Sequence, residues 1–141
     1  MYTHLWRATP YPALATFDAP DPFSTCTRRL RSNTPLQALT LLNDQAFVEL
    51  AEALALRIFR QAPGSEAAQM DLAFRLCLAR HPAPEEKQRL LALLDEEGNV
   101  QAVAAPPVAS KPGAPDDLRH LAAWTTVARV LLNLDETITR E

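Results

Sequence analysis

Apolar residues recur at every third or fourth position from residue 34 onward, the spacing that places them on one face of an α-helix. Thr34 is suited to an N-cap, Pro35 to the first helical position, and Gln37 to the third, so together they form a capping box. The predicted apolar face of this helix consists of Leu36, Leu39 and Leu42. Asn43 and Asp44 favour caps over helix interiors, so we predict a short helix that stops there and a new helix after it.

Three further helices are predicted before residue 99. The apolar stripe of the first contains Phe47, Leu50, Ala51, Leu54 and Ile58, and this helix should end before Pro63 and Gly64. The next begins with Ser65 as N-cap and should stop at His81 and Pro82; its stripe contains Met70, Ala73, Phe74, Cys77 and Leu78. Pro84 opens the third, with Gly98 as its expected C-terminal cap.

The segment 99–115 contains four prolines among alanines and valines, so we predict an exposed loop there. Asp116 or Asp117 is the expected N-cap of the last long helix. This helix carries apolar residues on two adjoining faces, and one of them contains Trp124. We therefore expect it to lie at the centre of the fold with Trp124 deeply buried.

The first 33 residues have a different pattern, because their prolines preclude long helices and no strand pattern fills the gaps. Five of the nine aromatic residues lie in this segment, namely Tyr2, Trp6, Tyr11, Phe17 and Phe23. Disordered segments are typically poor in aromatic residues, so we expect this segment to pack against a folded surface. Two alternatives remain open: it wraps the helices of this chain, or it belongs to an interface with a domain that these residues do not include.

The expected fold class is therefore all-α: an irregular bundle of about five helices at residues 34–141, preceded by an extended, aromatic-rich strap at residues 1–33. Apolar residues make up 48% and charged residues 22%, which is ordinary for a globular domain of 141 residues. No stretch approaches the roughly 20 apolar residues of a membrane span, and the first twelve residues lack the pattern of an export signal. With only three separated glycines, phosphate-binding and nucleophile-elbow motifs are absent.

Charge and metal-ligand patterns exclude further classes. The net charge of −3 argues against general affinity for nucleic acid, and we expect no nucleic-acid partner even though residues 1–34 carry a net charge of +2. Cys26 and Cys77 are 51 positions apart and form neither a metal motif nor a haem attachment site with the histidines, so no metal and no cofactor is expected in this chain. Cys77 is expected to be a small buried thiol.

One dense polar group stands out between residues 17 and 44. Its candidate binding residues are Asp18, Asp21, Arg28, Arg29, Arg31, Asn33, Asn43 and Asp44. Helix capping and turn chemistry account for about half of these polar groups. The remaining aspartates and arginines form either an ion-paired loop or an anion-binding site at a helix N-terminus.

Several segments are similar to a known family. LATFDAPD at 14–21, TRRLRSNTPLQALTLLND at 27–44, RHPAPEEKQRL at 80–90 and AAWTTVARVLLNLDETITRE at 122–141 resemble a domain family of unknown function. That family forms the C-terminal part of large planctomycete-type proteins, which often also carry a cytochrome-c-like domain and a second uncharacterised domain upstream. The resemblance implies a C-terminal piece of a larger, exported or periplasmic protein. It also implies that a reading frame continues upstream of Met1 and that any haem belongs to another domain.

Two functions follow as hypotheses. In the first, the chain is a non-catalytic accessory or interaction domain, and residues 1–33 dock onto upstream domains of the parent or onto another protein. In the second, Asp18, Asp21 and the arginines at 28–31 line part of an enzyme site for a polyanionic or carbohydrate substrate, which an upstream domain completes. The spacing of the two carboxylates cannot be obtained from a loop sequence.

Overall fold

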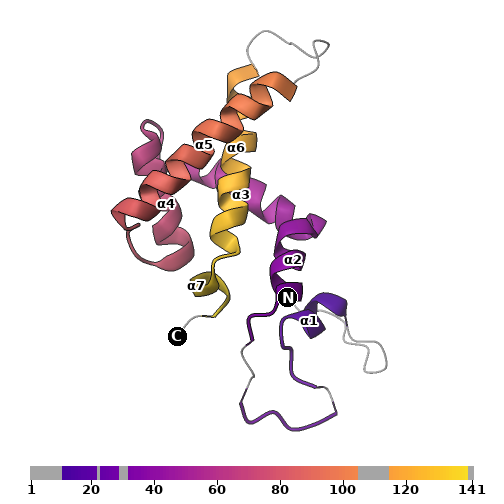
Figure 1. Cartoon of the computed structure of the whole chain (residues 1–141). Helices are drawn as coiled ribbons and strands as arrows, with labels where there is room; N and C mark the ends of the chain where they lie inside the picture. Colours follow the sequence, from indigo (N-terminus) through magenta and orange to yellow (C-terminus); the bar gives the residue numbers. More distant parts are fainter. Residues whose placement is uncertain (1–10, 22, 29–31, 105–114, 140–141) are drawn as a thin grey trace.

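The computed structural model describes residues 11–21, 23–28, 32–104 and 115–139, and within these ranges the chain forms seven α-helices and no strand (Figure 1). Five helices are longer than a single turn or two: α2 (Pro35–Asn43), α3 (Gln45–Gln61), α4 (Glu66–Leu78), α5 (Pro84–Ala104) and α6 (Pro115–Leu132). Two short ones, α1 (Pro12–Thr16) and α7 (Asp135–Ile138), lie near the ends of the chain. The prediction of an all-α fold is confirmed.

The starts of α2, α3 and α4 lie where the sequence places them. The Thr34 hydroxyl accepts a hydrogen bond of 3.3 Å from the Gln37 backbone N–H, and the Gln37 side chain accepts one of 3.0 Å from the Thr34 backbone N–H. This is the predicted capping box. Asp44 ends α2 and also caps α3 through the Ala46 N–H, and Ser65 caps α4. These starts are predictable because each signal lies within four residues of sequence.

The prediction for the region after Gly98 is wrong in part. Gly98 does not cap α5, which continues to Ala104, so residues 99–104 are helical and do not belong to a loop. A glycine costs a helix only about 1 kcal/mol, and no proline follows until Pro106, so nothing local stops the helix at Gly98. Residues 105–114 of the predicted loop lie outside the described residues.

The expected cap of α6 also needs correction. The helix begins at Pro115, a residue suited to the first helical position, so Asp116 and Asp117 belong to its first turn and neither is the N-cap.

Helix α6 is the centre of the fold, as predicted. It contacts α2, α3, α4, α5 and α7, and α5 and α6 run side by side in Figure 1. Trp124 is fully buried, and its ring meets that of Phe59 edge to face with 6.1 Å between centroids. The largest fully buried side chains around it come from α3, α4 and α6: Ile58, Met70, Phe74, Val127 and Leu131.

The predicted apolar face of α2 is wrong in part, because only Leu42 of its three leucines is half-buried. Leu36 and Leu39 are 60% and 58% exposed, and the buried residues of this helix are Gln37 and Leu41. In α3, Ala51 and Ile58 are buried as predicted, whereas Leu50 is 57% exposed. Periodicity shows which residues share a face, but it does not show which face a neighbouring element covers.

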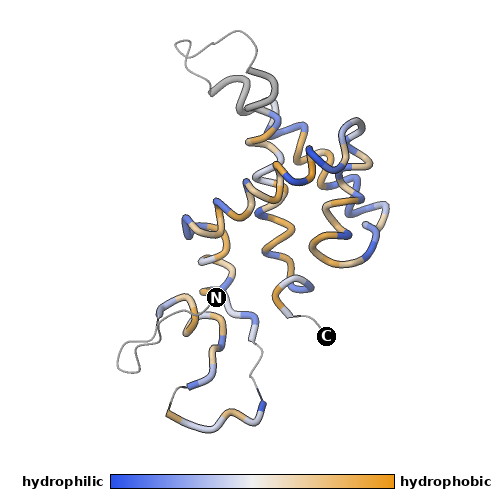
Figure 2. Tube along the Cα trace, turned by 180° about the vertical axis from the view of Figure 1, so that it is seen from behind, coloured by the Kyte–Doolittle hydropathy of each residue, from blue (hydrophilic) through white to orange (hydrophobic). Residues whose placement is uncertain are grey.

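The strap is not extended throughout, because Pro12–Thr16 forms the one-turn helix α1 with Pro12 in its first turn. We call the described residues of the strap, 11–21, 23–28, 32 and 33, the arm. In Figure 1 the arm, together with α2, projects from one end of the bundle, on the side away from α5. Hydrophobic positions, orange in Figure 2, continue along the chain into the arm and are not confined to the bundle. Tyr2 and Trp6 lie outside the described residues.

Candidate functional site

The polar group predicted from the sequence is organised around the Gln37 side chain, which is 1% exposed. Its Nε2 group donates to the Thr16 carbonyl at 2.9 Å, to the Ser32 hydroxyl at 3.0 Å and to the Asp18 carboxylate at 3.3 Å. Asp18 also accepts from the Ser32 N–H at 2.9 Å and the Ser32 hydroxyl at 2.6 Å. The carboxylate and the amide therefore fasten the strap to the first turn of α2.

Asp18 adopts a positive φ of 55°, a left-handed conformation that aspartate tolerates better than most residues. This conformation follows directly after α1 and turns the chain so that its carboxylate reaches residues 32 and 37. The sequence marks Gln37 as part of a cap, but no local pattern shows that its amide joins segments 19 and 21 residues away.

The other candidate residues do not converge on this centre. Asp21 closes a local turn by accepting from the Phe23 N–H at 3.0 Å and the Ser24 hydroxyl at 3.2 Å. Asn33 donates to Asp135 of α7 at 2.5 Å, and Asn43 donates to the Leu39 carbonyl within α2. Asp44 caps α3. Arg28 is exposed, while Arg29 and Arg31 lie outside the described residues.

A second charged cluster, which the sequence analysis missed, joins α4, α5 and α7. Arg80 binds the Glu86 carboxylate through two nitrogens, each at 2.7 Å, and binds Glu136 at 2.9 Å. The hydrogen bonds that Glu86 accepts from Arg80 and from the Ala83 N–H lower the pKa of Glu86 to about 2. Because both carboxylates are held by one guanidinium, this cluster is suited to fastening elements together and not to proton transfer.

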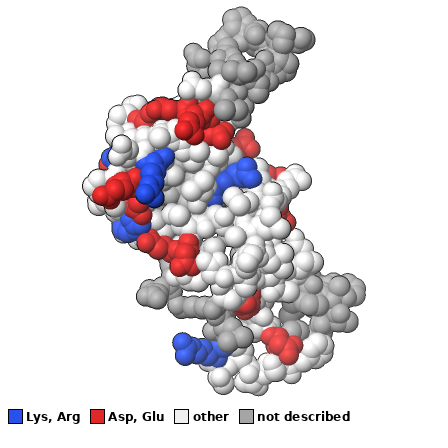
Figure 3. Space-filling model, viewed as in Figure 1, with Lys and Arg blue, Asp and Glu red and all other residues white. Residues whose placement is uncertain are grey.

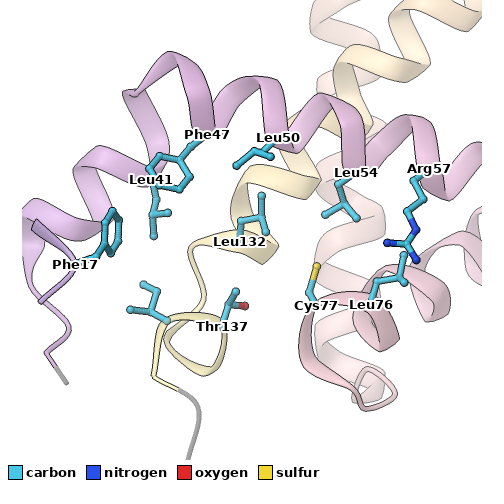
Figure 4. A pocket seen from close by; sticks show the side chains of 11 residues that line it. Phe17, Leu41, Phe47, Leu50, Leu54, Arg57, Leu76, Cys77, Leu132 and Thr137 are labelled. Atoms are coloured by element: carbon cyan, nitrogen blue, oxygen red, sulfur yellow. The ribbon is translucent and has the colours of Figure 1, made fainter. Parts of the chain in front are cut away.

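An apolar cavity of about 520 Å³ lies between α3, α4 and the C-terminal elements. Its lining residues are Phe17, Leu41, Phe47, Leu50, Leu54, Arg57, Leu76, Cys77, Leu132, Thr137 and Ile138. Figure 4 shows the phenylalanine rings at one end and Arg57, Leu76 and Cys77 at the other. Burial raises the pKa of the Cys77 thiol, as expected for a group in apolar surroundings.

Large apolar side chains are also exposed at several positions between residues 11 and 50. We call this set the apolar face: Tyr11, Leu14, Phe23, Leu36, Leu39 and Leu50. Every member belongs to the arm, α2 or the first half of α3. In the space-filling view of Figure 3, most charged side chains of the described residues lie over the upper half of the molecule, and a few lie lower down. Exposed apolar side chains that lie next to one another on a surface are typical of interaction sites.

Neither a metal site nor a membrane span emerges from the described ranges. They contain no group of three or more histidine, cysteine or acidic residues placed to hold a metal ion. No helix in this part of the chain is long and apolar enough to cross a membrane.

Comparisons with known proteins give one family. The profile of PSD1, described as a protein of unknown function (DUF1553), matches residues 1–94, which is two thirds of the chain. No curated protein and no solved structure matches significantly. The match includes the arm, α2, α3 and α4, and thus the whole apolar face and most of the residues that line the cavity.

Proposed function

We propose that this chain, which belongs to the PSD1 family of proteins of unknown function (DUF1553), is a non-catalytic docking domain whose apolar face binds another part of a larger protein. In this proposal the helical bundle is a rigid support. The arm, α2 and the first half of α3 are the surface that the partner covers.

One observation carries the proposal: every exposed large hydrophobic residue of the described chain lies between residues 11 and 50. The described parts of α4, α5 and α6 bury their large apolar side chains at least partly. Leu36 and Leu39 are spaced three apart and lie on one side of α2, while Gln37 and Leu41 attach its other side to the molecule. A helix held on one side and apolar on the other is suited to packing against a second surface.

The hydrogen bonds of the arm support the same function. The arm is held against α2 by hydrogen bonds among Asp18, Ser32 and Gln37. In addition, Phe17 packs on Phe47 of α3 with 5.5 Å between ring centroids. A surface that is ordered before binding loses less conformational entropy when the partner arrives. The enzyme alternative has less support, since Asp18 and Asp21 both serve as acceptors within the arm.

We further propose that the partner is the upstream region of the same polypeptide. The resemblance of the motifs at 14–21 and 27–44 to large planctomycete-type proteins with a cytochrome-c-like domain supports an exported or periplasmic parent. Aromatic and leucine side chains that are exposed in this chain alone would then be buried in the parent, where they stabilise the contact between its domains.

The test uses two polypeptides, this chain and the region encoded directly upstream of Met1, expressed separately and titrated by calorimetry. The double variant Leu36→Glu with Leu39→Glu should weaken binding at least about 100-fold, because each buried leucine contributes about 1.5 kcal/mol or more. Gln88→Glu with Ala92→Glu changes the charge equally on exposed positions of α5 and should bind like the wild type. Equal binding by both double variants, or no binding by the wild type, would contradict the proposal.

A further inference from the structure

The apolar cavity has the size and lining of a small-molecule site. Its volume of about 520 Å³ lies within the roughly 300–1,000 Å³ of typical ligand pockets. Helix α3 contributes one wall through Phe47, Leu50, Leu54 and Arg57, which are spaced three or four apart. Side chains from α4, α6 and α7 form the opposite wall (Figure 4). The cavity is therefore elongated along α3, with a hydrophobic middle.

Arg57 is the one charged residue among the eleven that line this cavity. No carboxylate lies beside it in the lining, and no ion pair joins Arg57 to an acidic residue elsewhere in the described ranges. Figure 4 shows its guanidinium directed toward Leu76 and Cys77 at one end of the cavity. A positive charge at the end of an apolar trough favours a ligand with one anionic end and a hydrocarbon body.

The neutral polar side chains of the lining offer a ligand few hydrogen bonds. The Thr137 hydroxyl already donates its proton to the Leu131 carbonyl at 2.7 Å. Cys77 is buried, with 8% of its surface exposed. A ligand would therefore be oriented by Arg57 and held by apolar contacts along the rest of its length.

We propose that this cavity binds an amphiphilic carboxylate, with its carboxylate on Arg57 and its hydrocarbon chain against Leu50, Leu54 and Leu132. The proposal does not rest on the docking function, because it can be tested on this chain alone. Leu50 is the one residue that the cavity lining shares with the apolar face. A carboxylate accepts two hydrogen bonds from a guanidinium, whereas an alcohol of the same chain length cannot replace that pairing.

The test measures binding of decanoate, decanol and butanoate to the purified chain by calorimetry, below the concentration at which decanoate forms micelles. We expect 1:1 binding of decanoate, weaker binding of decanol, and none of butanoate, which lacks the apolar body. Arg57→Gln should weaken decanoate binding about tenfold or more and leave decanol unchanged. Arg60→Gln, an exposed arginine of α3 outside the cavity, is the matched control and should bind decanoate normally.

A second pair of variants separates the cavity from the rest of the apolar surface. Leu50→Glu adds a carboxylate to the cavity lining and should abolish decanoate binding, whereas Leu36→Glu, at a similarly exposed position outside the lining, should not affect it. The proposal is overturned if decanoate does not bind, if Arg57→Gln binds as tightly as the wild type, or if Leu36→Glu weakens binding as much as Leu50→Glu. None of these results bears on binding of the upstream region, which the earlier titration measures.

Discussion

The guanidinium of Arg80 donates a hydrogen bond of 2.9 Å from Nε to the carboxylate of Glu136, a residue 56 positions further along the chain. The same guanidinium holds Glu86 at the start of α5 and lies over the Phe74 ring, 5.4 Å from its centroid. One side chain thus ties the turn between α4 and α5 to α7. These contacts fix α7, which contributes Thr137 and Ile138 to the cavity wall.

The Arg80 cluster predicts a specific dependence of stability on pH. The pKa of Glu86 falls from 4.5 to about 2 on folding, so its contribution is complete above about pH 4.5 and is lost as the pH drops toward 2. Because the Glu86 side chain is 37% exposed, we expect solvent screening to reduce this contribution to about 1 kcal/mol. Denaturant melts between about pH 5 and pH 2 should show a smaller loss of unfolding free energy in Glu86→Gln than in the wild type.

The control for this prediction is Glu85→Gln, which removes an exposed carboxylate one residue earlier that forms no ion pair with the described residues. Its stability should follow the pH as that of the wild type does. If Glu86→Gln loses as much stability as the wild type over the same range, the Arg80 pairing does not stabilise the fold.

The buried core and the apolar face should respond differently to truncation. Trp124→Ala removes a fully buried indole and leaves a cavity against α3, so it should lower the free energy of unfolding by about 3–5 kcal/mol. Leu36→Ala should change it by about 0.5 kcal/mol or less, because that side chain is mostly solvated in the isolated chain. Urea melts at neutral pH compare the two variants. A larger loss of unfolding free energy in Leu36→Ala than in Trp124→Ala would show that another part of this chain buries Leu36.

A backbone feature at the end of α4 allows the chain to be stabilised. Ala79 has φ 57° and ψ 22°, the left-handed conformation in which a Cβ costs about 1–2 kcal/mol and glycine does not. Ala79→Gly should therefore raise the unfolding free energy by about 1 kcal/mol. Ala53→Gly, at an exposed position inside α3, should lower it by a similar amount. Thermal melts in which both variants lose stability would contradict the left-handed end of α4.

Local signals explain what could be predicted from the sequence. Thr34, Ser65 and Pro84 each mark a helix start with groups only a few residues apart, so these boundaries are legible without knowledge of the fold. Trp124 is also predictable, because apolar residues occupy two adjoining faces of its helix and leave little of it for solvent.

Non-local relationships explain what could not be predicted. Leu36 and Leu39 look like core residues by their spacing, yet α2 uses its other side to contact α3 and α6. The hydrogen bonds from Gln37 to Thr16 and from Arg80 to Glu136 join residues 21 and 56 positions apart, which no periodicity specifies. Likewise, α5 continues past Gly98, because a glycine can end a helix but does not have to.

The central claim is that the apolar face is covered in the natural protein, and side-chain labelling by hydroxyl radicals tests it most directly. This chain and the larger parent protein proposed above, purified from its natural source, are labelled in parallel and analysed by mass spectrometry. We predict that Tyr11, Phe23, Leu36 and Leu39 are labelled in the isolated chain and protected in the intact protein, while exposed Arg75 on α4 is labelled equally in both. Equal labelling of the apolar face in both samples would contradict the docking function.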